Sequence, residues 1–276
     1  MLGSAVTQTF QSAGYDVCAV DHDALDITDS AAVEELTRRV RPDLIVNCAA
    51  FNDVDAAEDD PTIALRVNAM AMIGLARAAR HAGSVLVHYS SDFVFDGTAS
   101  RPYVESDPPN PQSVYASSKL LGEYLTAEAP KHYLLRVESL FGPAGSGRTA
   151  RRGSLGTIVD RLRRGESVPV FVDRTVSPSF TLDIADATRR LVESGAEPGL
   201  YHCVNDGAAT WLDIADEAAR LIRVDLRARP ITLDTVSMKA RRPRFCAMSP
   251  ARLASLGIVM PHWRDALGRY LARYAS

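Results

Sequence analysis

The sequence has few cysteines, and their spacing excludes the common metal and disulfide frameworks. Its 276 residues contain four, far apart, with no CxxC and no paired Cys/His spacing. Isolated thiols in or near apolar segments are typical of reduced, buried cysteines. We therefore expect a cytoplasmic protein with mostly buried free thiols and no metal site. The four are Cys18, Cys48, Cys203 and Cys246.

The sequence also lacks a strong charge excess and a long apolar run. The formal net charge of −3 argues against a general nucleic-acid binder. No apolar run reaches the length of a membrane span, and residues 1–4 lack a basic segment leading into an apolar core. We therefore expect neither a membrane partner nor a signal peptide.

What the sequence does contain is a regular alternation of helical and strand patterns. Strands that alternate with helices of ten or more residues are typical of an α/β fold with a doubly wound, parallel, Rossmann-type sheet. Apolar runs predict strands at 15–20, 43–47, 84–89 and 133–137, and helical spacing covers 2–13, 30–40, 61–81 and the residues around Tyr115.

The pattern loosens after Gly142, which indicates a second lobe. The glycine-rich loop 142–147 and the basic cluster 148–152 are expected to lead into it. We therefore divide the chain into a dinucleotide-binding domain at 1–142 and, at 143–276, mainly a smaller mixed α/β substrate-binding lobe with some segments returning to the main sheet. Its expected helices are 155–164, 182–193, 212–223 and 263–274, with strands near 168–172, 200–204 and 226–231.

The glycine-rich turn that normally opens a dinucleotide-binding sheet is largely missing. Such a sheet begins with a central strand and glycines whose amides hold the pyrophosphate. Gly3 would be the last of these glycines, and the first strand and the earlier glycines are absent. Either the start codon is placed too late, and in-frame codons upstream encode the strand and turn, or part of the cofactor site has been given up.

Other parts of a nucleotide site are present. Asp21 follows the expected second strand, where a carboxylate would accept hydrogen bonds from an adenosine ribose, although an Asp there is more often only a turn residue. Asp26 and Ile27 follow in a loop that could touch the adenine. Ala49 and Ala50 close the next strand with small side chains, which would let a dinucleotide approach the backbone.

Tyr115 and Lys119 are four residues apart and therefore project from one face of a helix. An ammonium about 4 to 5 Å from a phenol favours the phenolate by roughly 3 kcal/mol, or about two pKa units, so we expect Tyr115 to exchange a proton near neutral pH. A bare YxxxK is more often an apolar-face tyrosine and a solvated lysine. Ser91, however, ends the preceding strand at the same crevice, where its hydroxyl can donate to a carbonyl oxygen.

Together these features resemble the extended short-chain dehydrogenase/reductase superfamily and, within it, the dTDP-4-dehydrorhamnose reductase family. The resemblance implies reduction of dTDP-4-dehydrorhamnose to dTDP-L-rhamnose with NADH or NADPH. It implies Tyr115 as the general acid, Lys119 as the residue that lowers the Tyr115 pKa and holds the nicotinamide ribose, and Ser91 as the carbonyl-polarising hydroxyl. Asn68 is implied at the cofactor. The matching segments are 47–51, 67–69, 90–97, 115–123, 135–136, Asp173 with 177–178, 201–202, 242–243 and 263–264.

The resemblance also implies sugar-nucleotide contacts from Asp92, Phe93, Ser139 and Arg242. The family commonly has tyrosine at the position of Phe93 and tryptophan at that of Ser139, so a different 4-keto sugar nucleotide is an alternative. The Asp-Glu pair of the related dehydratases is absent, because Phe93 follows Asp92. The densest basic cluster consists of Lys239, Arg241, Arg242 and Arg244. It is either a solvated loop or a phosphate site, and Arg242 is the residue expected to reach the substrate diphosphate.

A binding protein is the second hypothesis. A non-catalytic relative of this family is the regulatory subunit of methionine adenosyltransferase, which binds a dinucleotide and a partner protein. The missing pyrophosphate loop favours that role, whereas a hydroxyl, a phenol and an ammonium in one crevice favour an enzyme. We favour the enzyme, with a nucleotide-sugar substrate as its partner and a homodimer left open.

Asp21 predicts the cofactor preference. Its carboxylate should accept a ribose 2′-hydroxyl and repel a 2′-phosphate, and no Arg or Lys follows within several residues. We expect NADH to be used at least as well as NADPH, and Asp21→Ala to shift the kcat/KM ratio towards NADPH. A wild-type enzyme that strongly prefers NADPH would show that Asp21 is only a turn residue.

Overall fold

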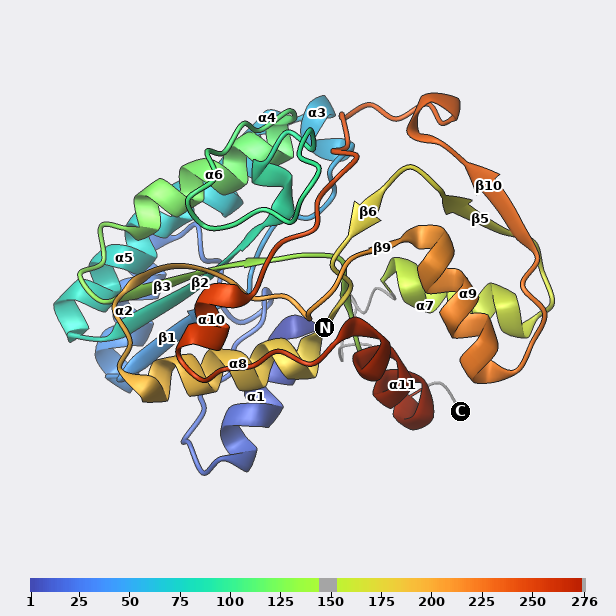
Figure 1. The fold of residues 1–276 in the computed structure, drawn as a ribbon. Coiled ribbons are helices and arrows are strands. Elements are labelled where there is room, and N and C mark those ends of the chain that lie inside the picture. The colour runs from blue at the N-terminus through green and yellow to red at the C-terminus, as the bar shows by residue number, and fades with distance from the viewer. Residues whose placement is uncertain (144–152, 275–276) are drawn as a thin grey trace.

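A four-stranded parallel sheet forms the centre of the larger lobe (Figure 1). The computed structural model describes residues 1–143 and 153–274, so most of the expected exit loop, at 144–152, lies outside the described residues. The sheet is ordered β1-β2-β3-β8, and its parallel pairing brings the carboxyl ends of the strands to one edge. The strands are β1 Leu44–Asn47, β2 Val85–Ser91, β3 His132–Val137 and β8 Gly199–His202.

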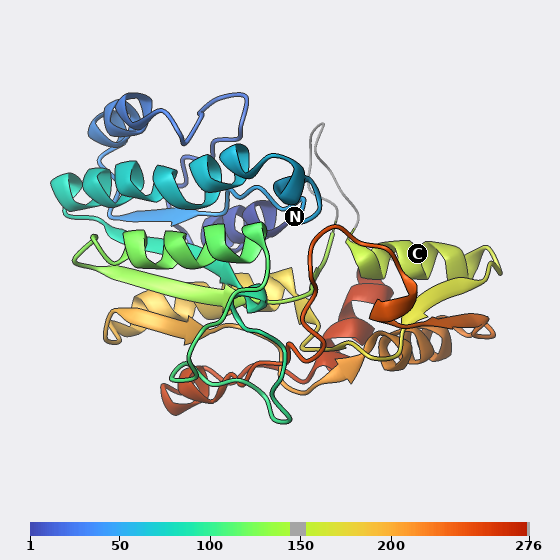
Figure 2. The ribbon, with the colours of Figure 1, turned by 90° about the horizontal axis from the view of Figure 1, so that it is seen from above.

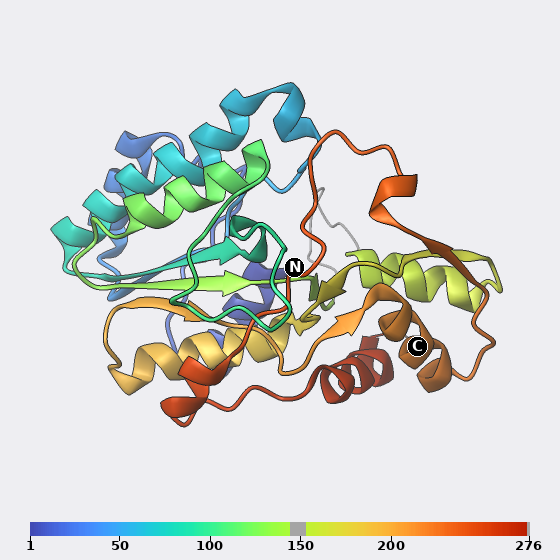
Figure 3. The same cartoon turned by 45° about the horizontal axis from the view of Figure 1, so that its top comes forward.

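Helices cover both faces of this sheet, as Figures 1 and 3 show. Successive side chains of β2 point to opposite faces: Val87 packs in the same core as Phe10 and Ile184, and Leu86 packs with Val33. The predicted doubly wound α/β fold is therefore confirmed. One face carries α1 Leu2–Ser12 and α8 Thr181–Ser194, and the other carries α2 Ser30–Val40, α5 Ala71–Ala82 and α6 Val114–Thr126.

The expected helix at 61–81 is interrupted by a π-helical turn. Asp60 caps its start by accepting from the Thr62 amide, and the π turn separates two α-helical parts. The segment Pro61–Ala82 is long and apolar enough to cross a membrane, contrary to the sequence expectation, but 56% of its most apolar window is buried within the fold. The parts are α4 Pro61–Leu65, η1 Arg66–Met70 and α5, and the short helix α3 Ala56–Asp59 precedes them.

A smaller lobe lies beside the sheet (Figure 2) and has its own core. Phe141, Leu162, Ile214 and Trp263 are buried together there. Its pairing is mixed, because β10 pairs parallel to β5 and β9 antiparallel to β6. The remaining elements are η2 Asp92–Val94, β4 Leu140–Phe141, α7 Ser154–Arg163, β5 Val168–Phe171, β6 Thr175–Val176, β7 Ser179–Phe180, β9 Ala209–Thr210, α9 Trp211–Ile222, β10 Ala228–Ile231, η3 Leu233–Thr235, α10 Ala251–Ser255 and α11 Trp263–Tyr274.

The strand predicted at 15–20 does not form. These residues have no regular structure, and Tyr15 and Val20 are 38% and 46% exposed. A strand needs a neighbour to pair with, and none of the described strands lies beside this segment. Cys18 is consequently exposed and Cys48 half-buried, whereas Cys203 and Cys246 are buried as expected.

A buried ion pair ties α6 to the sheet. Glu123 on α6 and Arg136 on β3 have side chains only 5% and 3% exposed, joined by hydrogen bonds of 2.9 and 2.8 Å. The Ser90 hydroxyl on β2 donates to the same carboxylate at 2.5 Å. Two neighbouring strands therefore hold one side chain of α6.

Replacing Glu123 tests this anchor. Glu123→Gln leaves the Arg136 charge buried without its counter-ion, so we expect a loss of about 3–5 kcal/mol in the free energy of unfolding, measured by chemical denaturation. The matched control is Glu35→Gln in the exposed Arg38 pair, which should not change stability measurably. An equal response of both variants would contradict the anchoring role.

Candidate active site

Ser91, Tyr115 and Lys119 meet where β2 ends beside α6. Ser91 is the last residue of β2. The Ser113 hydroxyl caps α6 by accepting from the Ala116 amide at 3.2 Å, which places Tyr115 and Lys119 on successive turns of the helix. All three side chains lie in the buried interior.

Ser91 and Tyr115 are held by neighbours in the turn that follows β2. The Ser91 hydroxyl donates to Asp92 Oδ1 at 2.9 Å and accepts from the Phe93 amide at 3.2 Å. The Phe93 ring packs edge-on against the Tyr115 ring, with centroids 5.5 Å apart. These contacts fix the hydroxyl and the phenol beside each other.

The expected lowering of the Tyr115 pKa is wrong for this structure. Burial raises the pKa to about 12; a hydrogen bond with Ser91 lowers it in part, and the negative charge of Asp92 raises it further. The Lys119 Nζ donates to the Tyr89 carbonyl oxygen at 2.6 Å. Helical spacing predicted the shared face but not the dominance of desolvation.

Lys119 is itself perturbed by burial. Its side chain is 2% exposed, and desolvation lowers its pKa to about 8, opposed by the negative charge of Glu123. The neighbouring imidazole of His88 has a pKa well below its usual range, because of burial and the Lys119 charge. Lys119 therefore remains the cation of this crevice at neutral pH.

Asn68 joins the loop after β1 to α6. It accepts from the Phe51 amide at 2.8 Å and donates to the Phe51 carbonyl and to the Ser118 hydroxyl, each at 3.0 Å. The backbone carbonyl oxygen of Asn68 lies so close to Gly122 that a β-carbon at position 122 would be 2.1 Å from this oxygen. Only glycine at position 122 permits this approach of η1 to α6.

The other expected cofactor residues are Gly3, Asp21, Asp26 and Ile27. Gly3 is in the first turn of α1, in van der Waals range of the Cys48 β-carbon. The Oδ1 of Asp21 accepts from the amides of residues 23 and 24, so its carboxylate stabilises the turn that follows it. This is the role expected of a turn residue. Asp26 likewise accepts from Thr28, while Ile27 lines a cavity of about 210 Å³ that Ser91 and Tyr115 do not line.

The loop after β1 carries Ala49 and Ala50, as expected. The Ala49 amide donates to Asn47 Oδ1 at 3.0 Å, which turns the chain at the strand end. Because Ala49 and Ala50 carry only methyl side chains, the backbone at these two residues can approach a bound dinucleotide closely.

Of the expected substrate residues, Asp92 and Phe93 adjoin Ser91, whereas Arg242 is already paired. Its guanidinium donates to both oxygens of Asp55, at 3.0 and 2.8 Å. Ser139 has a left-handed backbone with φ of 42°, directly after Glu138.

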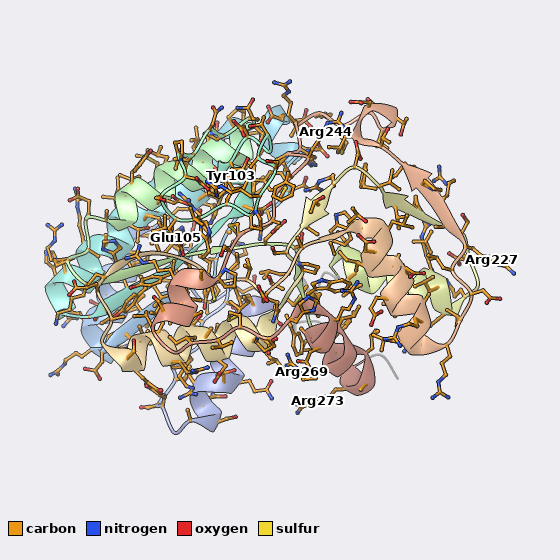
Figure 4. The ribbon with its side chains drawn as sticks, viewed as in Figure 1. Tyr103, Glu105, Arg227, Arg244, Arg269 and Arg273 are labelled. Carbon is orange, nitrogen blue, oxygen red and sulfur yellow. The ribbon has the colours of Figure 1, made fainter. Side chains whose placement is uncertain are left out.

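Two other members of the basic cluster are paired with acids, whereas Arg241 donates to the Gln112 side-chain oxygen at 3.5 Å. Lys239 donates to Asp59 at 2.7 Å, and Arg244 pairs with Asp173 and Asp234. Figure 4 places Arg244 on the segment that runs between the two lobes. Lys239 and Arg242 thus tie the second lobe to the first, while the Lys239 and Arg244 side chains stay about half exposed.

Sequence reasoning missed Glu138, Arg174 and Cys246, which gather next to Asp92. One signal was available: Glu138 is a charged residue directly after an apolar strand, at the sheet edge where ligands bind. Arg174 and Cys246 could not be placed there without the fold.

Comparison with known proteins agrees with this architecture. A sequence model of the family described as RmlD substrate binding domain matches residues 1–276. The chain belongs to this family. A dTDP-4-dehydrorhamnose reductase of Streptomyces griseus is 36% identical over 276 residues, covering 97% of this chain and 88% of the relative. A probable dTDP-4,6-dihydroxy-2-methyloxan-3-one 4-ketoreductase of Streptomyces antibioticus is also 36% identical, covering 97% and 90%.

Solved structures extend the similarity of this RmlD-family chain to three dimensions. A dTDP-4-dehydrorhamnose reductase of Clostridium acetobutylicum has a TM-score of 0.92 at 29% identity, covering 100% of this chain and 96% of its own. The reductase of Bacillus anthracis, in complex with NADP, has the same TM-score at 27% identity, covering 98% and 95%.

The Arg242–Asp55 pair predicts a measurable coupling between the lobes. Arg242→Ala and Asp55→Asn should each destabilise the RmlD-family fold, and the double variant should lose no more than Arg242→Ala alone, with a coupling of about 1 kcal/mol by chemical denaturation. The pKa of Asp55 is lowered, chiefly by its hydrogen bond with Arg242, so the coupling should be present above the ordinary Asp pKa and disappear as pH falls through the lowered value. Additive losses would show that Arg242 acts elsewhere.

Proposed function

We propose that this chain reduces the 4-keto group of a dTDP-linked 6-deoxyhexose with NADH or NADPH. The observation that carries the proposal is the convergence of Ser91, Tyr115 and Lys119 in one buried crevice at the carboxyl end of β2. A hydroxyl, a phenol and an ammonium so placed serve carbonyl reduction, whereas a binding scaffold such as a regulatory subunit needs none of them.

The roles follow from the protonation states. The cofactor supplies the hydride when bound. Tyr115, with its raised pKa, is protonated at neutral pH and can give its proton to the oxygen that gains negative charge. Ser91 donates a hydrogen bond to the same oxygen, and the Lys119 ammonium stabilises the phenolate that Tyr115 leaves behind.

A dinucleotide fits the residues at the sheet edge. The small side chains of Ala49 and Ala50 leave the backbone approachable, and Asn68 holds that loop against α6. Lys119 is within one helical turn of Tyr115, so it can reach a ribose beside the nicotinamide. These residues would hold the cofactor.

The substrate proposed is dTDP-4-dehydrorhamnose, giving dTDP-L-rhamnose. The S. griseus relative carries that name, and the S. antibioticus relative, equally identical, is named for a different dTDP-linked ketone. Both names share a dTDP group and a 4-ketone, which defines the substrate class. Arg242 would bind the diphosphate by exchanging Asp55 for phosphate oxygens.

The expected homodimer and cytoplasmic location stay predictions. A homodimer would use α6, whose outer face exposes Leu121 and Tyr124, the latter 63%.

Removing one phenol oxygen tests the mechanism. Tyr115→Phe keeps the ring packed against Phe93 but removes the transferable proton, so kcat should fall at least about 100-fold while the NADPH Kd hardly changes. Lys119→Met should impair both, because it also removes a ribose contact.

The matched control is Tyr124→Phe on the exposed side of the same helix, which should leave both quantities unchanged. Full reductase activity in Tyr115→Phe would refute the proposed role.

A further inference from the structure

A compact group of buried polar side chains lies directly behind Ser91. Asp92 follows Ser91 in the chain, Glu138 follows β3, and Cys246 comes from the segment that returns from the second lobe. The two carboxyl side chains belong to residues only 4% and 2% exposed. A carboxylate oxygen of each and the Cys246 Sγ all lie within 4.8 Å of one another.

Arg174 contributes a fixed positive charge to this group. Its Nη2 lies 3.8 Å from Cys246 Sγ, its Nε donates to the Pro243 carbonyl at 3.3 Å, and its charge acts on both carboxyls. With both carboxyls ionised, the group would carry a net charge of −1 in the interior. One bound proton makes it neutral, so burial favours keeping that proton.

Glu138 offers a place for the proton. Its Oε2 accepts from the Ser177 amide at 2.7 Å, whereas its Oε1 is buried with no hydrogen-bond partner among residues 1–143 and 153–274. A protonated carboxyl turns an oxygen into a donor, and the Asp92 carboxylate is the acceptor beside it. Burial, and then the Asp92 charge, raise the pKa of Glu138 well above its ordinary value.

We propose that Asp92 and Glu138 share one proton, and that this proton reverses the Asp92–Ser91 hydrogen bond so that the Ser91 hydroxyl donates to the substrate ketone. Glu138 is then a positioning residue, acting through Asp92. The proposal rests on the reductase function proposed above.

The direction of a single hydrogen bond explains the effect. Ser91 has one hydroxyl hydrogen, and in this structure it points to Asp92 Oδ1 at 2.9 Å. When the shared proton lies on Asp92, that carboxyl donates to Ser91, and the Ser91 hydrogen is free for the substrate oxygen. The two hydrogen bonds of this chain, from Asp92 to Ser91 and from Ser91 to the ketone, reinforce each other.

The same proton also assists Tyr115. The charge of Asp92 opposes a phenolate at Tyr115, and a shared proton removes much of that charge. The charged and titratable groups that face the Asp92–Glu138 pair are Arg174, Cys246 and Tyr115, from three separate segments. Of these, Arg174 lowers the pKa of both carboxyls.

The pH profile of Glu138→Gln tests the proposal. In the wild type, kcat/KM should fall as pH rises through the raised pKa of the pair. In Glu138→Gln only Asp92 of the pair titrates, and burial raises its pKa less far than that of Glu138, so the fall should move to lower pH. Above neutral pH the variant should therefore lose kcat/KM by at least about 10-fold relative to the wild type, and the loss should recover as pH is lowered.

Two further variants separate proton sharing from a structural role. Arg174→Gln removes a charge that lowers both pKa values, so its profile should shift to higher pH, opposite to Glu138→Gln. Glu105→Gln is the matched control: Glu105, labelled in Figure 4, also accepts a backbone amide, from His202 at 2.8 Å, and its profile should match the wild type. A Glu138→Gln profile that is unshifted, or lowered equally at every pH, would overturn the proposal.

A measurement without substrate keeps this test independent of the proposed function. The infrared spectrum of the wild-type protein at neutral pH should contain a protonated-carboxyl band that Glu138→Gln lacks and Glu105→Gln retains. Absence of the band in an active wild type would overturn the shared proton alone. An inactive wild type that shows the band would overturn the reductase function instead.

Discussion

The buried Glu123–Arg136 ion pair sets the position of the catalytic helix, and the rest of the crevice depends on it. Because Glu123 is held by β3 through Arg136 and by β2 through Ser90, α6 cannot slide along the sheet without leaving charge unpaired in the core. Lys119 and Tyr115 lie one and two turns earlier on α6, so their positions relative to Ser91 follow from the same anchor. Gly122 permits the close contact with η1 that the anchor requires.

The sequence predicted well those features that depend on periodicity and on parallel pairing. The helices 30–40 and 114–126 and the strands β1, β2 and β3 were readable because apolar spacing and capping residues act locally. The meeting of Ser91 with Tyr115 was also predictable, since parallel strands present their carboxyl ends at one edge and a residue spacing of four selects one helix face.

Features that depend on contacts between distant segments were not predictable. The strand expected at 15–20 has suitable residues but no neighbour, so its backbone stays unpaired. The guanidinium of Arg242 is a group that commonly binds phosphate. In this fold it is already paired with Asp55, 187 positions away in the chain. The pKa of Tyr115 depends on how completely the fold removes water, which helical spacing does not report.

The electrostatics of the crevice keep the Tyr115 phenol protonated, which suits a proton donor in ketone reduction. Burial opposes ionisation of the Tyr115 phenol, and so does the negative charge of Asp92 beside it. Tyr115 therefore keeps its proton until a stronger base forms next to it, and the alkoxide that forms as hydride reaches a ketone is such a base. Arg174 and Cys246, which complete the buried acid group, come from beyond the sheet's central strands. The second lobe therefore supplies part of the charge balance around Asp92.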